Sequence, residues 1–459
     1  MDNKLSLLVN NNKLLFDINV LNDTINLKIY ENSFVGKGAY GHVYYIDKIN
    51  DLQCVIKIGQ TDRNSFNFNY YETEAYFYCK YNSSENNTNC LPKLIDLGKT
   101  KNKVNAVYYD YLILEYVGAL NLNTLFNNVI CPSESDRCVM KILYNSAFIN
   151  LSSIHSHNII YRDISPNNLV ISNDVAKYFT ETNSFLKYKI SQNISPHIEG
   201  NYKFEDIVSK YFNDKHNELI KFIDAGLCCD IDQINYDSEK NIIDNFNDLF
   251  CCVYDEFDEL DGMFCSIIEY CSPFCLFNFS SILKNDTLRK DPATKLLISN
   301  LLKISDIWSF NIIFSINLYN ILRKGCYYFY TINKKKLANP RIYGKKLSAN
   351  TFIRMPFSCN EYMYLSNELM FVEKFNFSDE YKDNYEDLRN HIMSMLNKIL
   401  SFINSIISIS EQNKWRFLIS FSKDNIIHLS NYSSICLQEL QQTGKKYHEK
   451  IKNDMSLYL

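Results

Sequence analysis

The sequence predicts an α+β protein with two lobes, a small β-rich lobe followed by a larger α-helical lobe with two insertions. Strand-like segments gather before residue 118, and helical periodicity dominates after residue 120. The length of 459 residues is ample for two lobes that share a cleft. Apolar residues make up 46% and charged residues 22% of the chain, which is typical of a globular protein.

The N-terminal part of the chain predicts mainly strands. Residues 1–30 alternate short apolar runs with Asn-rich turns, and we treat them as an N-terminal extension without assigned structure. Residues 34–58 predict strands separated by a glycine-rich turn and a polar turn. A short amphipathic helix is predicted at 70–81, and an apolar run at 111–117 predicts another strand. The N-terminal lobe is therefore placed at residues 31–117.

The C-terminal lobe, residues 118–459, is predicted to be mostly helical. Its clearest helices lie at 140–157, 307–322 and 390–407. The second of these is apolar on nearly every side, as expected of a buried central helix. Two insertions and a C-terminal helical extension complete the lobe. They span residues 174–216, residues 227–290 and the chain from about residue 360 onward.

Charge and composition limit the expected partners and location. Lys and Arg number 48 against 52 Asp and Glu, a net charge of −4, so we expect no nucleic acid partner. The first residues hold no apolar run of signal-peptide length, and the uncharged apolar stretches are too short to span a bilayer, so no membrane insertion is expected. The 15 Cys include no CxxC pair, which favours reduced, packed thiols in the cytoplasm over a zinc site. Abundant Asn, Ile, Lys, Tyr and Phe indicate an AT-rich genome, as in a large DNA virus or a protist.

Two segments carry strong and opposite charge. Residues 227–262 contain eleven acidic residues and one Lys, whereas residues 323–354 contain nine basic residues and no acidic one. A solvated face is the usual reason for such a run of charge. Because the two charges are nearly equal and opposite, we also hypothesise that these segments face each other.

A glycine-rich turn joins the first two predicted strands. The sequence GKGAYGHV has the pattern G-x-G-x-x-G-x-V, with Gly36, Gly38 and Gly41 at the glycine positions. Glycine lets the backbone approach a phosphate closely, although an ordinary hairpin turn would also explain the pattern. A strand rather than a helix follows the turn, so the pattern is not of the dinucleotide-binding type.

The next predicted strand contains a lysine, Lys57, in the apolar sequence CVIKI. An unpaired buried ammonium group is costly, so this lysine requires a carboxylate partner. Glu72 and Glu74 in the following helix are the two candidates, and only one of them can face inward because they are two residues apart. The apolar stripe beside Glu74 favours that residue, while an ordinary surface pair is the alternative.

The most informative stretch is YRDISPNNLV, residues 161–170. It places Asp163 and Asn168 five residues apart on one loop, between a long helix and an apolar strand. On such a loop the carboxylate can accept a proton from an attacking hydroxyl group while the amide helps to hold a metal ion.

Two further aspartates follow apolar or helical signals. Asp224 leaves the apolar run LIKFI and is followed by Ala225 and Gly226, a position from which a carboxylate can hold a divalent cation. Asp306 is expected in the first turn of the buried helix, where it would either cap the helix or brace the loop around Asp163 by hydrogen bonds.

Taken in chain order, the glycine-rich turn, the strand lysine, the helix glutamate, the R-D-x-x-x-x-N loop and the D-x-G sequence resemble the eukaryotic-type protein kinase family. The resemblance spans residue 34 to about residue 322, interrupted by the two insertions. It implies a two-lobed protein-kinase-like fold with ATP and Mg²⁺ as cofactors. Residues 91–126 also resemble the hinge region of the casein-kinase and vaccinia-related-kinase branch.

The resemblance implies a role for each matching residue. Lys57, supported by Glu74, would hold the α- and β-phosphates of ATP. Asp163 would be the catalytic base, and Asn168 and Asp224 would bind Mg²⁺. The residues implied to cover or contact the nucleotide are Gly36, Lys37, Gly38, Ala39, Tyr40, Gly41, Val43, Glu115 and Val117.

Other positions are implied as supporting residues or depart from the family pattern. Leu114 would be the gatekeeper, and Asp306 would anchor the catalytic loop. Tyr161 replaces the usual His, Ser165 stands where Ser/Thr kinases commonly have Lys, and Ala225 replaces the Phe of D-F-G. The loss of that Phe removes an aromatic ring that would link the site to the helix bearing the glutamate.

The function implied by this resemblance is ATP- and Mg²⁺-dependent transfer of the γ-phosphoryl group to Ser or Thr hydroxyl groups of protein substrates. Two alternatives remain open. The departures at Ser165 and Ala225 are compatible with a pseudokinase that acts as a nucleotide- or partner-binding scaffold. A small-molecule kinase of the aminoglycoside or choline type would share the aspartate and asparagine pattern, but it would usually lack the glycine-rich turn. The identity of the substrates and the oligomeric state are not predicted.

Overall fold

The computed structural model describes most of the chain. The described residues are 13–37, 41–60, 67–82, 89–129, 133–182, 203–234, 236–237, 277–278, 285–332, 379–413, 416–419 and 422–459. They form an α+β protein with a small antiparallel sheet followed by a helical region, which confirms this part of the prediction. The described residues leave out most of the acidic segment (227–262) and the part of the basic segment (323–354) beyond residue 332. They also leave out the five cysteines between residues 230 and 275.

The sheet has five antiparallel strands in the order β3-β4-β5-β7-β6. The strands are β3 (Phe34–Lys37), β4 (His42–Ile49), β5 (Leu52–Gln60), β6 (Leu94–Lys101) and β7 (Tyr108–Glu115). The strands predicted within 34–58 and at 111–117 are therefore confirmed. The position of β5 in the middle of the sheet explains its apolar sequence, because both of its faces are covered.

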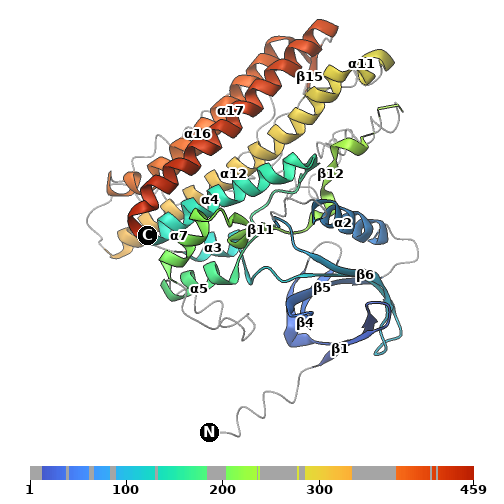
Figure 1. Cartoon of the computed structure of the whole chain (residues 1–459). Helices are drawn as coiled ribbons and strands as arrows, with labels where there is room; N and C mark the ends of the chain where they lie inside the picture. The colour runs from blue at the N-terminus through green and yellow to red at the C-terminus, as the bar shows by residue number, and fades with distance from the viewer. Residues whose placement is uncertain are drawn as a thin grey trace.

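Two different elements cover the two faces of the sheet. On one face, β1 (Leu14–Val20) and β2 (Ile25–Tyr30) form an antiparallel pair whose apolar side chains share a core with Ile56 and Ile58 of β5. On the other face lies helix α2 (Asn67–Asn82), next to β6 and β7 (Figure 1). Residues 14–30 are thus part of the packed sheet region. Because side chains alternate along a strand, Lys57 points to the α2 side.

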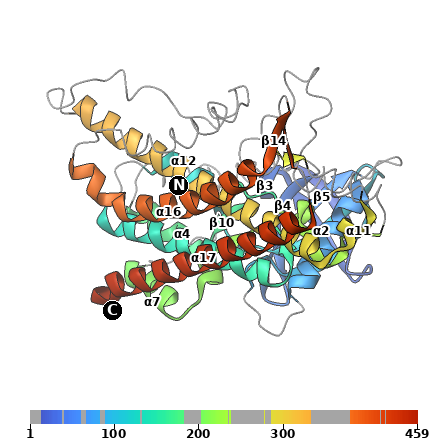
Figure 2. The same cartoon turned by 90° about the horizontal axis from the view of Figure 1, so that it is seen from above.

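The helical region is built around α4, whose side chains are buried along most of its length. Its main helices are α3 (Leu122–Asn128), α4 (Glu134–Ser156), α5 (Asn173–Thr182), α7 (Phe204–Phe212), α11 (Asp286–Lys290), α12 (Pro292–Ile332), α16 (Asp379–Ser408) and α17 (Lys423–Met455). The helices predicted at 307–322 and 390–407 lie within α12 and α16. The helix predicted at 140–157 lies within α4 except for its last residue, and α4 begins earlier, at Glu134. In Figure 2 the long helices α12, α16 and α17 extend beside α4.

Short strands connect the sheet region with the helices. β8 (Leu120–Asn121), β10 (Leu169–Ile171) and β11 (Ile220–Phe222) form one small sheet, and β9 (Ile159–Ile160) pairs with β12 (Cys229–Asp230). A third small sheet contains β13, β14 and β15. Its strands are Phe277–Asn278, Ser410–Asn413 and Arg416–Ile419.

The start of α12 corrects one sequence-based expectation. Asp306 was expected in the first turn of this helix, but the helix begins at Pro292, so Asp306 lies inside it and cannot cap it. The true start follows Asp291, whose carboxylate accepts a hydrogen bond from the N–H of Ala293 at 2.9 Å. An acidic residue followed by Pro at the first helical position is a typical helix start.

The last helix packs closely on the rest of the helical region. α17 lies along α12 and α16, and it also contacts α4. Gly444 permits the α4 contact, because a Cβ atom at this position would lie 2.1 Å from a ring carbon of Phe148. The C-terminal helices therefore share the main core with α4 and α12.

A buried histidine lies at this helix junction. The ring of His391 stacks on Tyr447 with 4.0 Å between the ring centroids, and it meets the ring of Tyr144 edge-on at 5.4 Å. Burial, opposed by Asp387 and assisted by Lys450, lowers the pKa of His391 to about 3. His391 is therefore neutral in the folded protein at physiological pH.

Among the described residues, one helical segment, Pro292–Ser315, is long and apolar enough by composition to cross a membrane. Its most apolar window is 78% buried inside the protein, as in the central helix of a folded core.

Candidate active site

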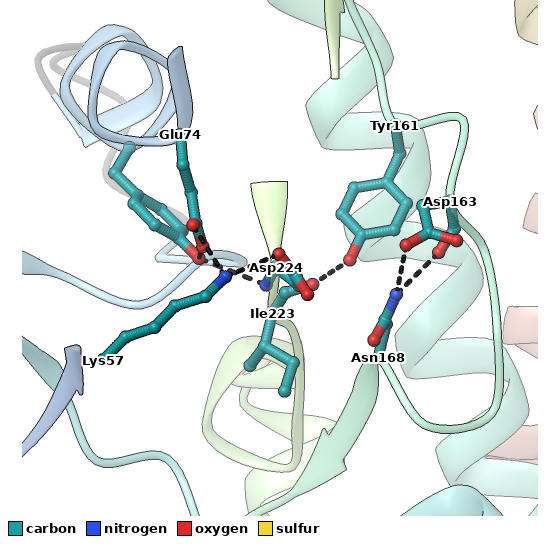
Figure 3. A network of polar contacts seen from close by, with 8 residues as sticks. Lys57, Glu74, Tyr161, Asp163, Asn168, Ile223 and Asp224 are labelled. Carbon is teal, nitrogen blue, oxygen red and sulfur yellow. Dashed lines mark hydrogen bonds and ion pairs between the residues drawn. The ribbon is translucent and has the colours of Figure 1, made fainter. Parts of the chain in front are cut away.

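The centre of the candidate site is a buried lysine between two carboxylates (Figure 3). Lys57 is 5% exposed, and its Nζ lies 2.9 Å from Oε2 of Glu74 and 2.9 Å from Oδ1 of Asp224. Glu74 is 1% exposed, whereas Glu72 points to solvent. The structure thus pairs Lys57 with Glu74, the residue that the apolar stripe of the helix favours, and it brings Asp224 to the same ammonium group.

The charges of this cluster stabilise one another. Burial by itself disfavours the charged form of Lys57, but the carboxylates of Glu74 and Asp224 outweigh that effect and raise its pKa. Lys57 is therefore an ammonium ion at neutral pH. Removal of Lys57 would leave the buried carboxylate of Glu74 without its cation, and loss of a buried partner of this kind typically costs about 3–5 kcal/mol.

Tyr78 connects helix α2 with the backbone of Asp224. It lies one helical turn after Glu74, and its hydroxyl group donates to Oε1 of Glu74 at 2.9 Å. The hydroxyl oxygen of Tyr78 in turn accepts a hydrogen bond from the backbone N–H of Asp224 at 3.2 Å. Asp224 has a left-handed backbone with φ of 63°, and the fully buried Ala225 follows it. Ala225 lacks the aromatic ring that would connect the site with α2, and Tyr78 of α2 makes this connection instead.

Asp306 holds the loop that carries Asp163. Its carboxylate accepts hydrogen bonds from the backbone N–H of Tyr161 at 2.7 Å and of Arg162 at 2.9 Å. Arg162 has a left-handed backbone with φ of 67°, a strained conformation that these bonds help to maintain. The Nε2 atom of His155, at the end of α4, lies 2.9 Å from the same carboxylate. The expected bracing role of Asp306 agrees with this geometry.

Asp163 and Asn168 meet across their loop. The amide nitrogen of Asn168 donates to Oδ2 of Asp163 at 2.8 Å and to its backbone carbonyl at 3.1 Å. Burial and the nearby charge of Asp224 raise the pKa of Asp163, while the bond from Asn168 acts in the opposite direction. A carboxylate with a raised pKa is better suited to accept a proton near neutral pH.

A strand pair brings the two predicted metal ligands to one place. β10 and β11 pair with Leu169 opposite Phe222, and the N–H of Ile223 donates to the carbonyl of Asn168 at 2.9 Å. Asn168 precedes one strand and Asp224 follows the other, so both side chains leave the same end of the pair. Tyr161 adds a further tie, since its hydroxyl group donates to the carbonyl of Ile223 (Figure 3).

The glycine-rich turn lies at the end of the neighbouring hairpin. Gly36 pairs with Val43 across β3 and β4, and Val43 pairs in turn with Lys57 across β4 and β5. A Cβ atom on Gly41 would lie 2.7 Å from the carbonyl oxygen of Ile58, so this position requires glycine. Lys37 is exposed. The turn residues Gly38, Ala39 and Tyr40 lie outside the described residues.

The predicted hinge begins where β7 ends. Leu114 is buried, and the carboxylate of Glu115 receives hydrogen bonds from Nζ of Lys221 at 2.7 Å and from the N–H of Lys93 at 3.0 Å. In the part of the chain that the structure describes, the backbone N–H of Val117 donates no hydrogen bond. Sequence reasoning did not assign the Lys221–Glu115 pair or the bonds of Tyr78 and His155, because each depends on residues that only the fold brings together.

The comparisons with known proteins add little to this geometry. No protein-family model matches the sequence. Among solved structures, the crystal structure of the BubR1 kinase domain is similar to this chain with a TM-score of 0.28 and 18% sequence identity. The match covers 45% of this chain and 48% of that chain, so it spans about half of each. A similarity of this size does not define a fold or a family.

Proposed function

We propose that this protein is an ATP- and Mg²⁺-dependent protein kinase that transfers the γ-phosphoryl group of ATP to Ser or Thr hydroxyl groups of protein substrates. In this proposal the sheet region and the helical region are the two lobes of a kinase-like fold. The observation that carries the proposal is the cluster in which Lys57 contacts both Glu74 and Asp224. Asn168 leaves the same end of the strand pair as Asp224 and donates a hydrogen bond to Asp163, so the proposed metal ligands and the proposed base lie beside this cluster. We further propose a cytoplasmic location.

The residues of the cluster fit the roles that phosphoryl transfer requires. Asn168 and Asp224 offer hard oxygen ligands, which suit Mg²⁺. Such an ion neutralises charge on the phosphate oxygens during transfer. The amide nitrogen of Asn168 is bonded to Asp163, which leaves the amide oxygen to face a cation. Lys57, oriented by Glu74, would meet the α- and β-phosphates with its ammonium group.

Asp163 is proposed as the catalytic base. It would accept the proton of the attacking hydroxyl group, and Asn168 and the braced backbone of the loop would keep its carboxylate in place. The adenine ring would lie near Val117, just after β7, whose N–H donates to no group within the described residues and so offers a donor. The preference for Ser or Thr acceptors is supported by the resemblance of the R-D-x-x-x-x-N loop alone, and Ser165 in place of the usual Lys predicts a slower transfer step.

The test is an acceptor screen. The full chain is incubated with Mg²⁺ and ATP labelled in the γ-phosphate, in parallel with basic, neutral and acidic protein substrates and with aminoglycosides and choline. We expect label on Ser or Thr of at least one protein, and we expect chelation of Mg²⁺ to abolish the labelling. Label on a small molecule instead would support the small-molecule kinase. ATP binding without any transfer would support the pseudokinase, and either result would overturn the proposal.

A further inference from the structure

A second cluster of chemically capable side chains lies in the helical region, apart from the candidate active site. Asp214 follows α7, His216 lies in the short helical turn η2 (His216–Glu218), and His448 lies on α17. Oδ1 of Asp214 is 3.6 Å from Nε2 of His216 and 3.6 Å from Nε2 of His448. All three potential ligand atoms lie within 4.8 Å of one another. The fold thus gathers two imidazoles and one carboxylate from three separate elements.

Hydrogen bonds on the far side of His448 determine which of its nitrogens faces this cluster. Its Nδ1 lies 2.8 Å from the hydroxyl oxygen of Tyr211 and 3.0 Å from Oδ1 of Asn145. Because the hydroxyl group of Tyr211 donates to Oδ1 of Asn145 at 2.7 Å, both neighbours present lone pairs to Nδ1. Nδ1 therefore carries the hydrogen, and Nε2 turns a free lone pair toward Asp214.

His216 is arranged in a similar way. It is 6% exposed, its Nδ1 lies 3.4 Å from the hydroxyl oxygen of Ser146 on α4, and its Nε2 faces Asp214. Its Nε2 therefore approaches the same carboxylate oxygen, Oδ1 of Asp214, as Nε2 of His448 does.

Two of the three separations in the cluster are close to those of a metal site, and the third, between the two imidazole nitrogens, is within 4.8 Å. Two ligands of a tetrahedral zinc ion, each about 2.0–2.1 Å from the metal, are about 3.3 Å apart. The two carboxylate–imidazole separations of 3.6 Å need only a small contraction. Outer hydrogen bonds to the second imidazole nitrogen are also typical of zinc-binding histidines.

One neighbouring charge competes with a metal ion at this place. Nζ of Lys452 lies 2.7 Å from Oδ1 of Asp214, the oxygen that both imidazoles approach. A carboxylate oxygen that faces an imidazole lone pair needs a positive charge beside it, and Lys452 supplies that charge in this structure. The pair lies at the surface, with 67% of the Asp214 side chain and 21% of the Lys452 side chain accessible.

We propose that Asp214, His216 and His448 form a zinc site that fastens α17 to the segment before β11. The ion would displace the ammonium group of Lys452, and water would complete its coordination. His216 lies four residues before Ile220, where β11 begins, so the site would also anchor the strand that leads to Asp224. The inference is independent of the proposed kinase activity.

The test is zinc binding by the untagged full chain after chelator treatment and dialysis. Zinc content is measured by elemental analysis, affinity by competition with a chromophoric chelator, and stability by thermal unfolding with and without zinc. We expect one equivalent of zinc per chain and a higher Tm in its presence. The variants His216→Gln, His448→Gln and Asp214→Asn should each weaken binding by at least about tenfold. His428→Gln, an exposed position on the same helix α17, is the matched control and should bind zinc normally.

The variant Lys452→Met separates a metal site from a simple ion pair. If the cluster is a zinc site, removal of the competing ammonium group should tighten zinc binding severalfold. If Lys452 only neutralises Asp214, the variant should lower the Tm and bind no zinc. Absence of stoichiometric zinc in the wild type, or equal binding by Asp214→Asn and the wild type, would overturn the proposal. Because the Asp214 side chain is exposed, we expect the Asp214→Asn variant to fold. Its zinc binding can therefore be compared directly with that of the wild type.

Discussion

The hydroxyl group of Tyr78 links the helix that carries Glu74 directly to the backbone of Asp224, the aspartate proposed to bind Mg²⁺. The substitution Tyr78→Phe keeps the buried ring but removes the bond to Oε1 of Glu74 at 2.9 Å and the bond from the N–H of Asp224 at 3.2 Å. Tyr78 and Glu74 are fully or almost fully buried, so water cannot replace the lost partner.

The expected magnitude follows from those two bonds. An unsatisfied buried polar group costs about 1–3 kcal/mol, and Glu74 keeps its ion pair with Lys57, so we expect a loss of about 2 kcal/mol in the free energy of unfolding. If the activation free energy of phosphoryl transfer rises by a similar amount because Glu74 and Asp224 are less well positioned, the rate falls by about tenfold to a hundredfold, since about 1.4 kcal/mol corresponds to a factor of ten.

The assay combines urea unfolding with measurement of kcat and of KM for ATP. Tyr81→Phe is the matched control, because Tyr81 lies on the same helix, is also buried, and pairs its hydroxyl group with Ser153 at 3.1 Å, away from Glu74 and Asp224. The control should lose some stability and keep its rate. The reasoning would be refuted by an unchanged rate in Tyr78→Phe, or by an equal loss of rate in both variants.

Three other predictions concern the loop and the helical core. Asp306→Asn should reduce kcat by about tenfold or more with a smaller change in KM for ATP, because the amide has only one oxygen to accept from the two loop N–H groups; an unaltered kcat would show that the brace is dispensable. Gly444→Ala should lower the urea midpoint by the equivalent of about 1–3 kcal/mol, because the new methyl group would meet the ring of Phe148, and an unchanged midpoint would contradict the packing. His391 has a folded-state pKa of about 3 against about 6.5 when unfolded, so its contribution to stability is complete above pH 6.5 and is lost as pH falls toward 3. Between pH 7 and pH 5 this loss amounts to about 2 kcal/mol, and His391→Phe should remove it from the pH dependence of unfolding, whereas a parallel pH dependence in both proteins would argue against a neutral His391.

The sequence predicted the parts of the site that depend on local pattern. Lys57 lies in an apolar strand and needs a counter-charge, and the helical stripe beside Glu74 selects that residue over Glu72. The strand and helix positions followed from apolar periodicity in the same way. These inferences need only a few neighbouring residues, which is why they agree with the structure.

The parts that sequence reasoning missed depend on long-range contacts or on competing local signals. The start of α12 was misplaced because Asp306 looked like a cap, although Asp291 and Pro292 carry the stronger start signal. The zinc-site candidates could not be found by spacing, because His448 lies on α17, far along the chain from His216. No local sequence pattern predicts that His216 and His448 are neighbours, because only the packing of α17 brings the two rings together.

The central claim is that Asp163 accepts the proton of the attacking hydroxyl group of the substrate, while other residues bind ATP. The most direct measurement is therefore ATP affinity and transfer rate in Asp163→Asn, in which the amide keeps the size of the carboxylate. The account predicts an ATP affinity within a few-fold of wild type and a transfer rate lower by about a hundredfold to ten-thousandfold, the usual contribution of a general base. Wild-type transfer in this variant would contradict the claim, as would a loss of ATP binding equal to the loss of rate.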